Sequence, residues 1–149
     1  RSLATGQPDE QFVTLFLDKH MFGVSVLRVQ DVIIPDRIAM IPLAPPEVMG
    51  AINLRGRIVT VIDLRARVGL SPADRTKQLT SVTVPVDGEL YSLCVDSVGD
   101  VLTVASNLIE PLPPTVDSRW RHLASSVVRL ETGLMTLLDI DRVIEFVRK

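Results

Sequence analysis

The chain has 149 residues, of which 46% are hydrophobic and 23% are charged, so it can form a packed core beneath a polar surface. Its formal net charge of -2 argues against nucleic acid as the main partner, because phosphate binding requires an excess of cations. No stretch approaches the roughly 18 consecutive apolar residues of a membrane span, and the single cysteine, Cys94, excludes an internal disulfide framework and fits a reducing compartment.

The first half of the chain predicts short β-strands separated by turns. Pro35 ends the one segment whose apolar residues have helical spacing. Gly56 supplies the positive φ that a reversal between strands needs, and Asp63 is a suitable N-cap for a following helix. The predicted elements are a flexible terminus at 1–10, strands at 12–17 and 21–26, one or two helical turns within 27–34, two strands that meet at Arg55-Gly56-Arg57, and a short helix at 64–68.

The second half continues with the same kind of pattern. Residues 71–79 are polar and contain Pro72, so they are predicted to form a linker. After the linker, apolar β-branched runs alternate with turns, and the chain closes with an amphipathic helix. The predicted elements are strands at 82–86, 90–95, 98–104, 126–130 and 134–140, and a helix from about Asp141.

The two halves repeat each other in sequence, as two ungapped alignments of the chain with itself show. The early alignment places Val13 on Val82 and Asp31 on Asp100, and the late alignment places Asp63 on Asp139. Chance similarity between β-rich segments is the alternative, but the aspartates recur in register with the apolar positions. We therefore predict an internal duplication. Each unit of about five short strands is too small to be comfortably stable alone, so the two should share a core and leave a groove at their seam.

No residue pattern indicates catalysis or a bound cofactor. His20 and His122 show no dyad spacing, and Cys94 lies among apolar residues, as a buried and inert thiol does. One cysteine cannot supply a zinc motif, and the glycines are too isolated for a phosphate-binding loop. Turns and helix caps account for the aspartates. We therefore predict a protein that is not an enzyme and that binds no metal, nucleotide or flavin.

The segment best suited to binding is a cationic turn between two apolar strands, around residues 50–64. In one interpretation, Arg55 and Arg57 only keep the tip of a hairpin soluble. In the other, Asn53 and Arg55 are held in fixed geometry for a partner, or they tie the hairpin to the helical turn that carries Asp31. The spacing of the residues is compatible with both.

The same segment resembles a known family. Asn53-Leu54-Arg55-Gly56, followed by Asp63-Leu64, resembles the signature of the CheW family, the adaptor proteins of bacterial chemotaxis. The segments 22–32 and 95–102 are also similar to that family, and the resemblance covers about residues 11–147. Two positions depart from the family pattern: Thr60 stands where proline is common, and Asp31 stands where glutamate is usual.

The resemblance implies a mainly β fold of two SH3-like five-stranded β-barrels, with short helices and a C-terminal helix. It places the barrels at about 11–70 and 80–140, joined by the linker at 71–79, with the helix at 141–149. It further implies a non-catalytic cytoplasmic adaptor, monomeric when isolated, that couples the cytoplasmic tips of chemoreceptors to the regulatory domain of the histidine kinase CheA. The alternative is a regulatory domain of a larger signalling protein, either the kinase itself or a fusion to a receiver.

The resemblance also implies which residues bind these partners. Asp31 and Arg55 are expected to form an ion pair that orients the groove wall. Val29 and Ile33 fit a core as well as they fit a groove. The residues expected to line the receptor groove are Val29, Val32, Ile33, Asn53, Leu54, Arg55 and Gly56. The residues expected to contact the kinase are Pro46, Glu47, Val48 and Met49.

Overall fold

Short β-strands dominate the computed structural model, which describes residues 8–148. The strands are β1 (Asp9–Leu17), β2 (His20–Ser25), β3 (Asp31–Ile33), β4 (Val48–Leu54), β5 (Arg57–Asp63), β6 (Thr80–Val86), β7 (Glu89–Val95), β8 (Ser97–Ala105), β9 (Ile109–Glu110), β10 (Ala124–Leu130) and β11 (Gly133–Leu138). The helical elements are the 3-10 turns η1 (Val26–Arg28), η2 (Ser106–Leu108) and η3 (Arg121–Leu123), and the helices α1 (Leu64–Arg67) and α2 (Ile140–Arg148). This mainly β architecture confirms the predicted fold class.

The N-terminal boundary lies earlier than the sequence predicted. Residues 1–7 of the expected flexible terminus lie outside the described residues, but Asp9 and Glu10 already belong to β1. They pair with Ala105 and Val104 of β8, because the long strand β8 offers partners beyond the apolar run that the sequence made visible.

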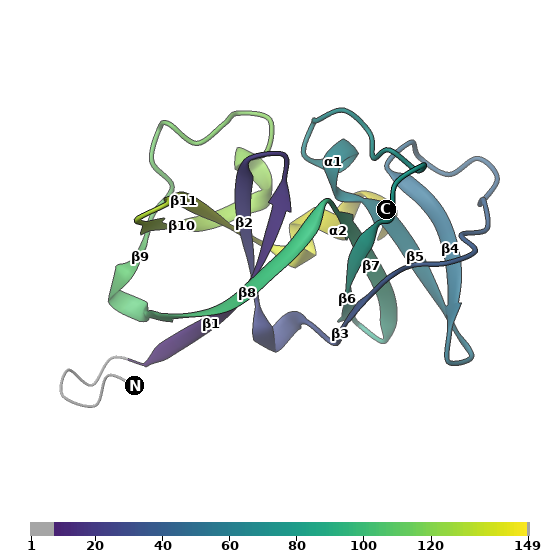
Figure 1. Cartoon of the computed structure of the whole chain (residues 1–149), viewed down its shortest axis with the longest axis horizontal. Helices are drawn as coiled ribbons and strands as arrows, with labels where there is room; N and C mark the ends of the chain where they lie inside the picture. Colours follow the sequence, from purple (N-terminus) through teal and green to yellow (C-terminus); the bar gives the residue numbers. More distant parts are fainter. Residues whose placement is uncertain (1–7, 149) are drawn as a thin grey trace.

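The strands form two sheets, each of which curls into a barrel (Figure 1). The first barrel has the strand order β8-β1-β2-β11-β10-β9, and the second barrel has the order β3-β6-β7-β5-β4. The first barrel has a sixth strand, not the five predicted, because the two-residue β9 pairs with β10. In the second barrel a single bridge between Ala39 and Ala51 takes the corresponding place.

The two barrels exchange hairpins, so neither coincides with a half of the chain. The β1–β2 hairpin of the first half joins β8–β11, while the β6–β7 hairpin of the second half joins β3–β5. Two parallel pairings hold these exchanged hairpins, β2 beside β11 and β7 beside β5. The predicted limits at 11–70 and 80–140 therefore do not describe the barrels. The apolar pattern of a sequence identifies strands, but it does not identify which strands become neighbours.

The exchange of hairpins is consistent with the internal duplication that the sequence indicates, because equivalent hairpins of the two halves are exchanged. The early alignment relates β1–β2 to β6–β7, and the late alignment relates β4–β5 to β10–β11. Backbone hydrogen bonds repeat in the late alignment: the Asp63 N–H donates to Glu47 O at 2.8 Å, and the Asp139 N–H donates to Leu123 O at 2.9 Å. The barrels are thus related by an internal pseudo-symmetry.

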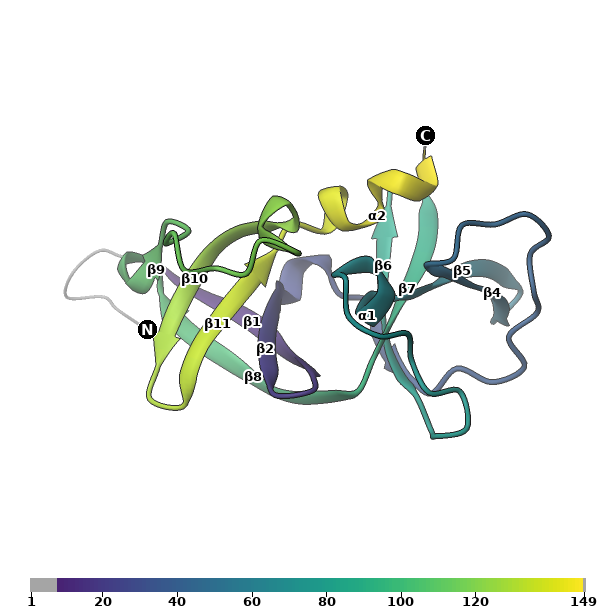
Figure 2. The same ribbon diagram turned by 90° about the horizontal axis from the view of Figure 1, so that it is seen from above.

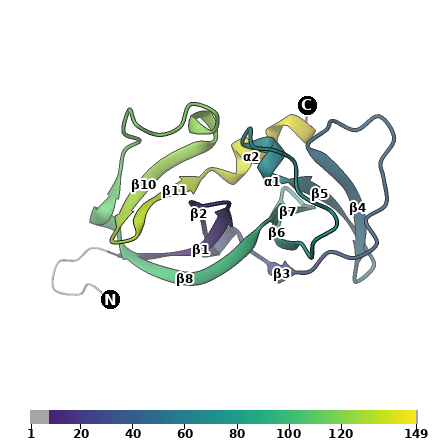
Figure 3. The same ribbon diagram turned by 45° about the horizontal axis from the view of Figure 1, so that its top comes forward.

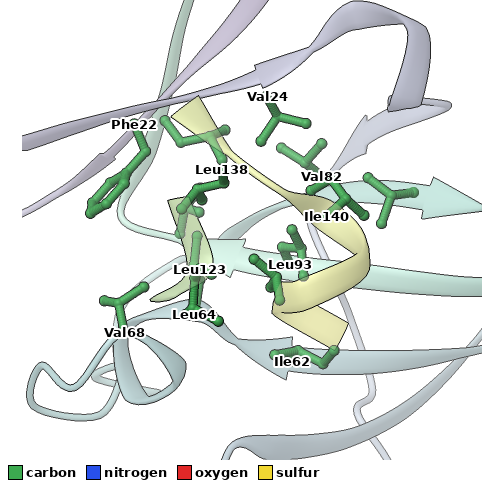
Figure 4. Packing of buried hydrophobic residues seen from close by; sticks show 14 of the residues in the cluster. Phe22, Val24, Ile62, Leu64, Val68, Val82, Leu93, Leu123, Leu138 and Ile140 are labelled. Atoms are coloured by element: carbon green, nitrogen blue, oxygen red, sulfur yellow. The ribbon is translucent and has the colours of Figure 1, made fainter. Parts of the chain in front are cut away.

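The buried apolar side chains form three clusters. The largest, the shared core, lies between the barrels and includes Phe22 from the first barrel and Val82 and Leu93 from the second (Figure 4). Two smaller clusters fill the barrels themselves, around Met135 in the first and around Val59 in the second. The late alignment places Val59 on Met135, so the barrel interiors repeat as well. The predicted shared core is therefore confirmed.

Helix α2 lies across both barrels on one side of the molecule (Figure 2). Its apolar face, with Ile140, Val143 and Ile144, packs into the shared core, which accounts for the amphipathic pattern of this segment. The Arg67 guanidinium of α1 donates to the Val143 carbonyl oxygen at 2.7 Å and so connects the two helices. The helix begins at Ile140, one residue before the predicted start.

The segment 27–34 is not helical beyond one short turn, which corrects the prediction of one or two helical turns there. Only η1 is helical, and Asp31 to Ile33 form β3, an edge strand paired with β6. The apolar spacing of this segment is equally compatible with a turn followed by a β-branched strand. The unpaired edge of β6 decides the outcome, because it offers hydrogen bonds such as the one from the Gln30 N–H to Thr83 O at 2.8 Å.

Candidate partner-binding surface

The turn between β4 and β5 has a fixed geometry. Leu54 pairs with Arg57, which leaves a two-residue turn of Arg55 and Gly56 with φ values of 51° and 84°. Two positive φ values are typical of a type I′ hairpin, whose twist matches that of the strands. The Asn53 Oδ1 accepts a hydrogen bond from the Gly56 N–H at 2.9 Å. The turn therefore presents the Arg55 side chain from a backbone that is held locally.

Arg55 reaches from this turn to the edge strand β3. Its Nη2 lies 3.4 Å from the Asp31 Oδ2, while 69% of the Arg55 side chain and 27% of the Asp31 side chain are exposed. The contact involves one nitrogen and one oxygen, and Asp31 lies on a strand and not on the helical turn that the sequence predicted. It bridges the seam of the second barrel, between β3 and the β4–β5 turn. Such an exposed pair contributes only about 0–1 kcal/mol to stability, so its effect is mainly to orient the turn.

The structure divides the apolar residues expected in the groove between surface and core. Val32 is 50% exposed, whereas Val29 packs against the shared core, and Ile33 and Leu54 pack against the core of the second barrel. Val32 and Asp31 are adjacent on β3, so the exposed part of the site combines one apolar side chain with the ion pair. The partly buried Val29, Ile33 and Leu54 support this surface.

A second apolar surface lies in the connection between β3 and β4. This apolar loop, residues 34–47, exposes 85% of Met40, all of Leu43 and much of Ile34. It is fixed to β4 by two hydrogen bonds of 2.8 Å between Ala39 and Ala51. Large apolar side chains placed between prolines were the available signal, since a loop that only connects strands seldom carries them.

The residues expected to contact the kinase lie at the end of the apolar loop, and they differ in accessibility. Pro46 is exposed, and Glu47 and Val48 are partly buried. Met49 is only 3% exposed and belongs to the core of the second barrel, so it is a packing residue and not a contact residue. Its position in β4 explains this, because successive residues of a strand face opposite sides of the sheet.

Cys94 and His20, which could in principle take part in chemistry, pack against other residues of the fold. Cys94 is buried, and burial raises the pKa of its thiol to about 12, so it remains protonated at neutral pH. His20 begins β2 and packs edge-on against the buried Trp120, with ring centroids 4.9 Å apart. Within residues 8–148, no three His, Cys, Asp or Glu side chains are arranged to hold a metal. No helix in this range has the length and hydropathy needed to cross a membrane.

Comparison with known proteins gives a consistent result. Residues 11–148 match the family model described as the CheW-like domain. The chemotaxis protein CheW of Rhizobium meliloti is 31% identical over 82% of this chain and 79% of its own length. The probable chemotaxis protein CheW of Rhizobium etli is 28% identical over 91% of this chain and 87% of its own length.

A solved structure has the same architecture. The crystal structure of the scaffolding protein TtCheW from Thermoanaerobacter tengcongensis superimposes with a TM-score of 0.83, at 28% sequence identity, and the match covers 93% of this chain and 94% of that one. The described fold, the turn formed by Asn53 to Gly56 and the family match over almost the whole length agree with one another. The chain therefore belongs to the CheW-like domain family.

Proposed function

We propose that this protein is a non-catalytic adaptor of bacterial chemotaxis, which couples the cytoplasmic tips of chemoreceptors to the histidine kinase CheA. The observation that carries the proposal is the rigid turn of Asn53 to Gly56, joined by Arg55 to Asp31, on a fold shared with a scaffolding protein. Relatives named chemotaxis protein CheW match over most of their own length, which favours an adaptor over a domain of a larger signalling enzyme.

In this proposal the receptor tip binds the surface formed by β3 and the β4–β5 turn. Val32 supplies an exposed apolar contact, and Asn53, Arg55 and Gly56 supply a polar edge of fixed geometry. Val29, Ile33 and Leu54 act indirectly, since they pack beneath this surface and hold its shape.

The kinase regulatory domain is assigned to the apolar loop. Pro46, Glu47 and Val48 lie at its end, and the exposed Met40 and Leu43 extend the same surface. A loop with two fully or largely exposed apolar side chains, fixed to a strand by paired hydrogen bonds, has the character of a protein-contact site. The adaptor works as a monomer in the cytoplasm, at the inner face of the membrane that holds the receptors.

Reconstitution tests the proposal directly. Membranes that contain receptors, mixed with CheA and no other adaptor, should gain receptor-controlled kinase activity when the purified chain is added. Val32→Asp should weaken binding to receptor membranes by tenfold or more, and Met40→Asp should weaken binding to the isolated kinase regulatory domain to a similar degree. Leu108→Asp is the matched control, because Leu108 is an exposed apolar residue of η2 in the first barrel.

Two outcomes would contradict the proposal. A chain that binds neither receptor membranes nor CheA is not an adaptor of this kind. A chain that binds a separate adaptor but gives CheA no receptor control would be the regulatory domain of a larger protein instead.

A further inference from the structure

The seam of the first barrel contains an open hollow that the proposed adaptor contacts do not use. It lies between the edge strand β8 and the β10–β11 turn, which face each other in Figure 3, and it has a volume of about 420 Å³. Phe16, Met21, Leu102 and Leu130 supply its apolar surface. Asp100 and Glu131 are exposed beside them.

The internal duplication shows what this hollow corresponds to. The early alignment places Asp31 on Asp100, and the late alignment places Arg55 on Glu131. In the same way, Ile33 falls on Leu102 and Leu54 falls on Leu130. The hollow in the first barrel is therefore the counterpart of the seam that the Asp31–Arg55 ion pair bridges in the second barrel.

The charges at the two seams differ, and this difference determines whether a seam is bridged or stays open. In the second barrel an arginine on the turn meets an aspartate on the edge strand. In the first barrel both positions carry carboxylates, Asp100 and Glu131, and like charges disfavour closing the seam between them. No lysine, arginine or histidine is among the described residues that line the hollow. The apolar surface therefore stays open beneath two uncompensated negative charges.

The base of the hollow is held rigidly. β8 passes so close to β1 at Gly99 that a Cβ there would come within 2.5 Å of the Thr14 Oγ1 and 2.8 Å of the Phe16 ring. The Thr14 hydroxyl donates a hydrogen bond to the Asp100 carbonyl oxygen at 2.7 Å. A preformed apolar hollow needs little reorganisation to accept a guest side chain.

We infer that this seam binds a segment of a partner protein that presents a long apolar side chain next to an arginine or lysine. The apolar side chain fills the hollow against Leu102 and Leu130. The guest cation lies between Asp100 and Glu131, where it supplies the positive charge that Arg55 supplies in the second barrel. Burial of the apolar group gives most of the affinity, and the exposed carboxylates select for the cation.

Titration of the isotope-labelled full chain with short synthetic peptides tests this inference by NMR. The probe is a capped peptide of the sequence Gly-Leu-Arg-Leu-Arg-Gly, and its controls replace arginine by glutamate or leucine by serine. The basic apolar probe should shift the amide signals of Gly99, Leu102 and Leu130, and both controls should bind at least tenfold more weakly. Raising the salt concentration should weaken the binding, because the carboxylates are exposed. Equal binding of the acidic control, or shifts confined to other surfaces, would overturn the inference.

Two charge variants, measured with the same probe, test the role of the charges at the seams. Glu131→Arg recreates the charge pattern of the second barrel, so it should pair with Asp100 and reduce probe binding by tenfold or more, whereas Glu131→Gln should reduce it less. Arg55→Glu should open the seam of the second barrel and add probe-dependent shifts at Ile33 and Leu54. Both changes lie on exposed turns, and an unchanged amide spectrum away from the turn verifies folding. Undiminished binding to Glu131→Arg, or no new shifts in Arg55→Glu, would contradict the role assigned to these charges.

Discussion

Arg55 is expected to contribute little to stability but much to the proposed function. Its single 3.4 Å contact with Asp31 is exposed, so Arg55→Ala should melt within a few degrees of the wild type. Because the turn then loses its orientation, receptor-dependent control of the kinase should be lost. Thermal melting and the reconstituted kinase assay measure the two effects.

The charge swap is the control for this prediction. Arg55→Asp combined with Asp31→Arg should recover part of the kinase control if pairing across the seam is what matters. If the double variant performs no better than either single variant, Arg55 instead contacts a partner directly.

Val29 and Val32 make a matched pair of apolar residues. Val29 packs against the shared core, whereas Val32 is half exposed on β3. Val29→Asp should therefore lower the melting temperature strongly, because it places an unpaired charge against an apolar core. Val32→Asp should melt close to the wild type and lose receptor binding. Equal melting temperatures for the two variants would show that Val29 is not a core residue.

At the scale of single residues, the sequence predicted polar positions better than apolar ones. The capping role of Asp63 follows from helix-cap chemistry, whereas the pairing of Asp31 with Arg55 was implied only by the family resemblance, and the structure has both contacts. The burial of Met49 did not follow, because the side of a strand that faces the core depends on register with its neighbours. That register is set by strands from the other half of the chain.

The caps of α1 and α2 let the two repeats be compared at the scale of elements. Asp63 is buried, and its carboxylate accepts hydrogen bonds from the Ala66 N–H at 3.4 Å and from the Ala73 N–H at 2.8 Å. Asp139 occupies the equivalent position, but its carboxylate accepts one hydrogen bond, from the Arg142 N–H at 3.3 Å, and forms an ion pair with the Arg142 side chain.

We expect Asp63→Ala to destabilise the protein by about 1–3 kcal/mol, since it leaves two partly buried N–H groups without acceptors. Asp139→Ala should cost about 1 kcal/mol, as an ordinary helix cap does. Urea unfolding of both variants measures the difference. A larger loss from Asp139→Ala would show that the linker contact of Asp63 adds nothing.

Among the elements, most of the strands were predictable, because alternating or β-branched runs end at turn residues. The segment 27–34 was not, since its apolar spacing fits a helical turn and a short strand equally well. The free edge of β6 resolved the ambiguity in favour of β3. A local pattern cannot contain this information, because β6 lies in the other half of the chain.

At the scale of the whole molecule, Arg65 connects the two barrels electrostatically. Its guanidinium, only 14% exposed, lies 2.8 Å from both the Asp18 Oδ1 and the Asp96 Oδ2. Asp18 lies in the β1–β2 turn of the first barrel, whereas Arg65 belongs to α1, which follows β5 of the second. The hydrogen bond from Arg65 holds the pKa of the Asp18 carboxyl below its ordinary value.

Because the pKa of Asp18 is lower in the folded state, its ionised carboxylate stabilises the protein at pH values above the ordinary carboxyl pKa of about 4. This contribution is lost as the pH falls through the pKa of the folded state. Arg65→Met should therefore melt below the wild type at pH 7, and the gap should narrow below about pH 4. Arg57→Met is the control, because Arg57 donates to the Gly88 carbonyl oxygen and not to a carboxylate. A gap that stays constant from pH 7 to pH 3 would contradict this role.

The exchange of hairpins predicts that the halves of the chain cannot fold separately. A fragment of residues 1–75 has β3–β5 without β6 and β7, and it has the β1–β2 hairpin without a barrel to join. Neither this fragment nor residues 76–149 should give a dispersed amide spectrum alone, but an equimolar mixture should recover the native spectrum. Independent folding of either fragment would contradict the dependence of each barrel on both halves.

The duplication was predictable from the sequence, but the exchange was not. Both arrangements bury the same apolar positions and use the same turns, so they leave the same pattern in the sequence. The pairings that join one half to the other distinguish them: β1 with β8, β2 with β11, β3 with β6 and β7 with β5.

The same exchange determines the order in which the two barrels can fold during synthesis on the ribosome. Synthesis completes the second barrel with β7, whose last residue is Val95. The β1–β2 hairpin precedes the strands of the second barrel, yet its neighbours β8 and β11 are made only after that barrel is complete. Pairings between distant parts of a chain form slowly, and apolar strands that wait for partners invite aggregation. The β1–β2 hairpin should therefore be the part of the described chain most prone to aggregate until β8 and β11 have emerged.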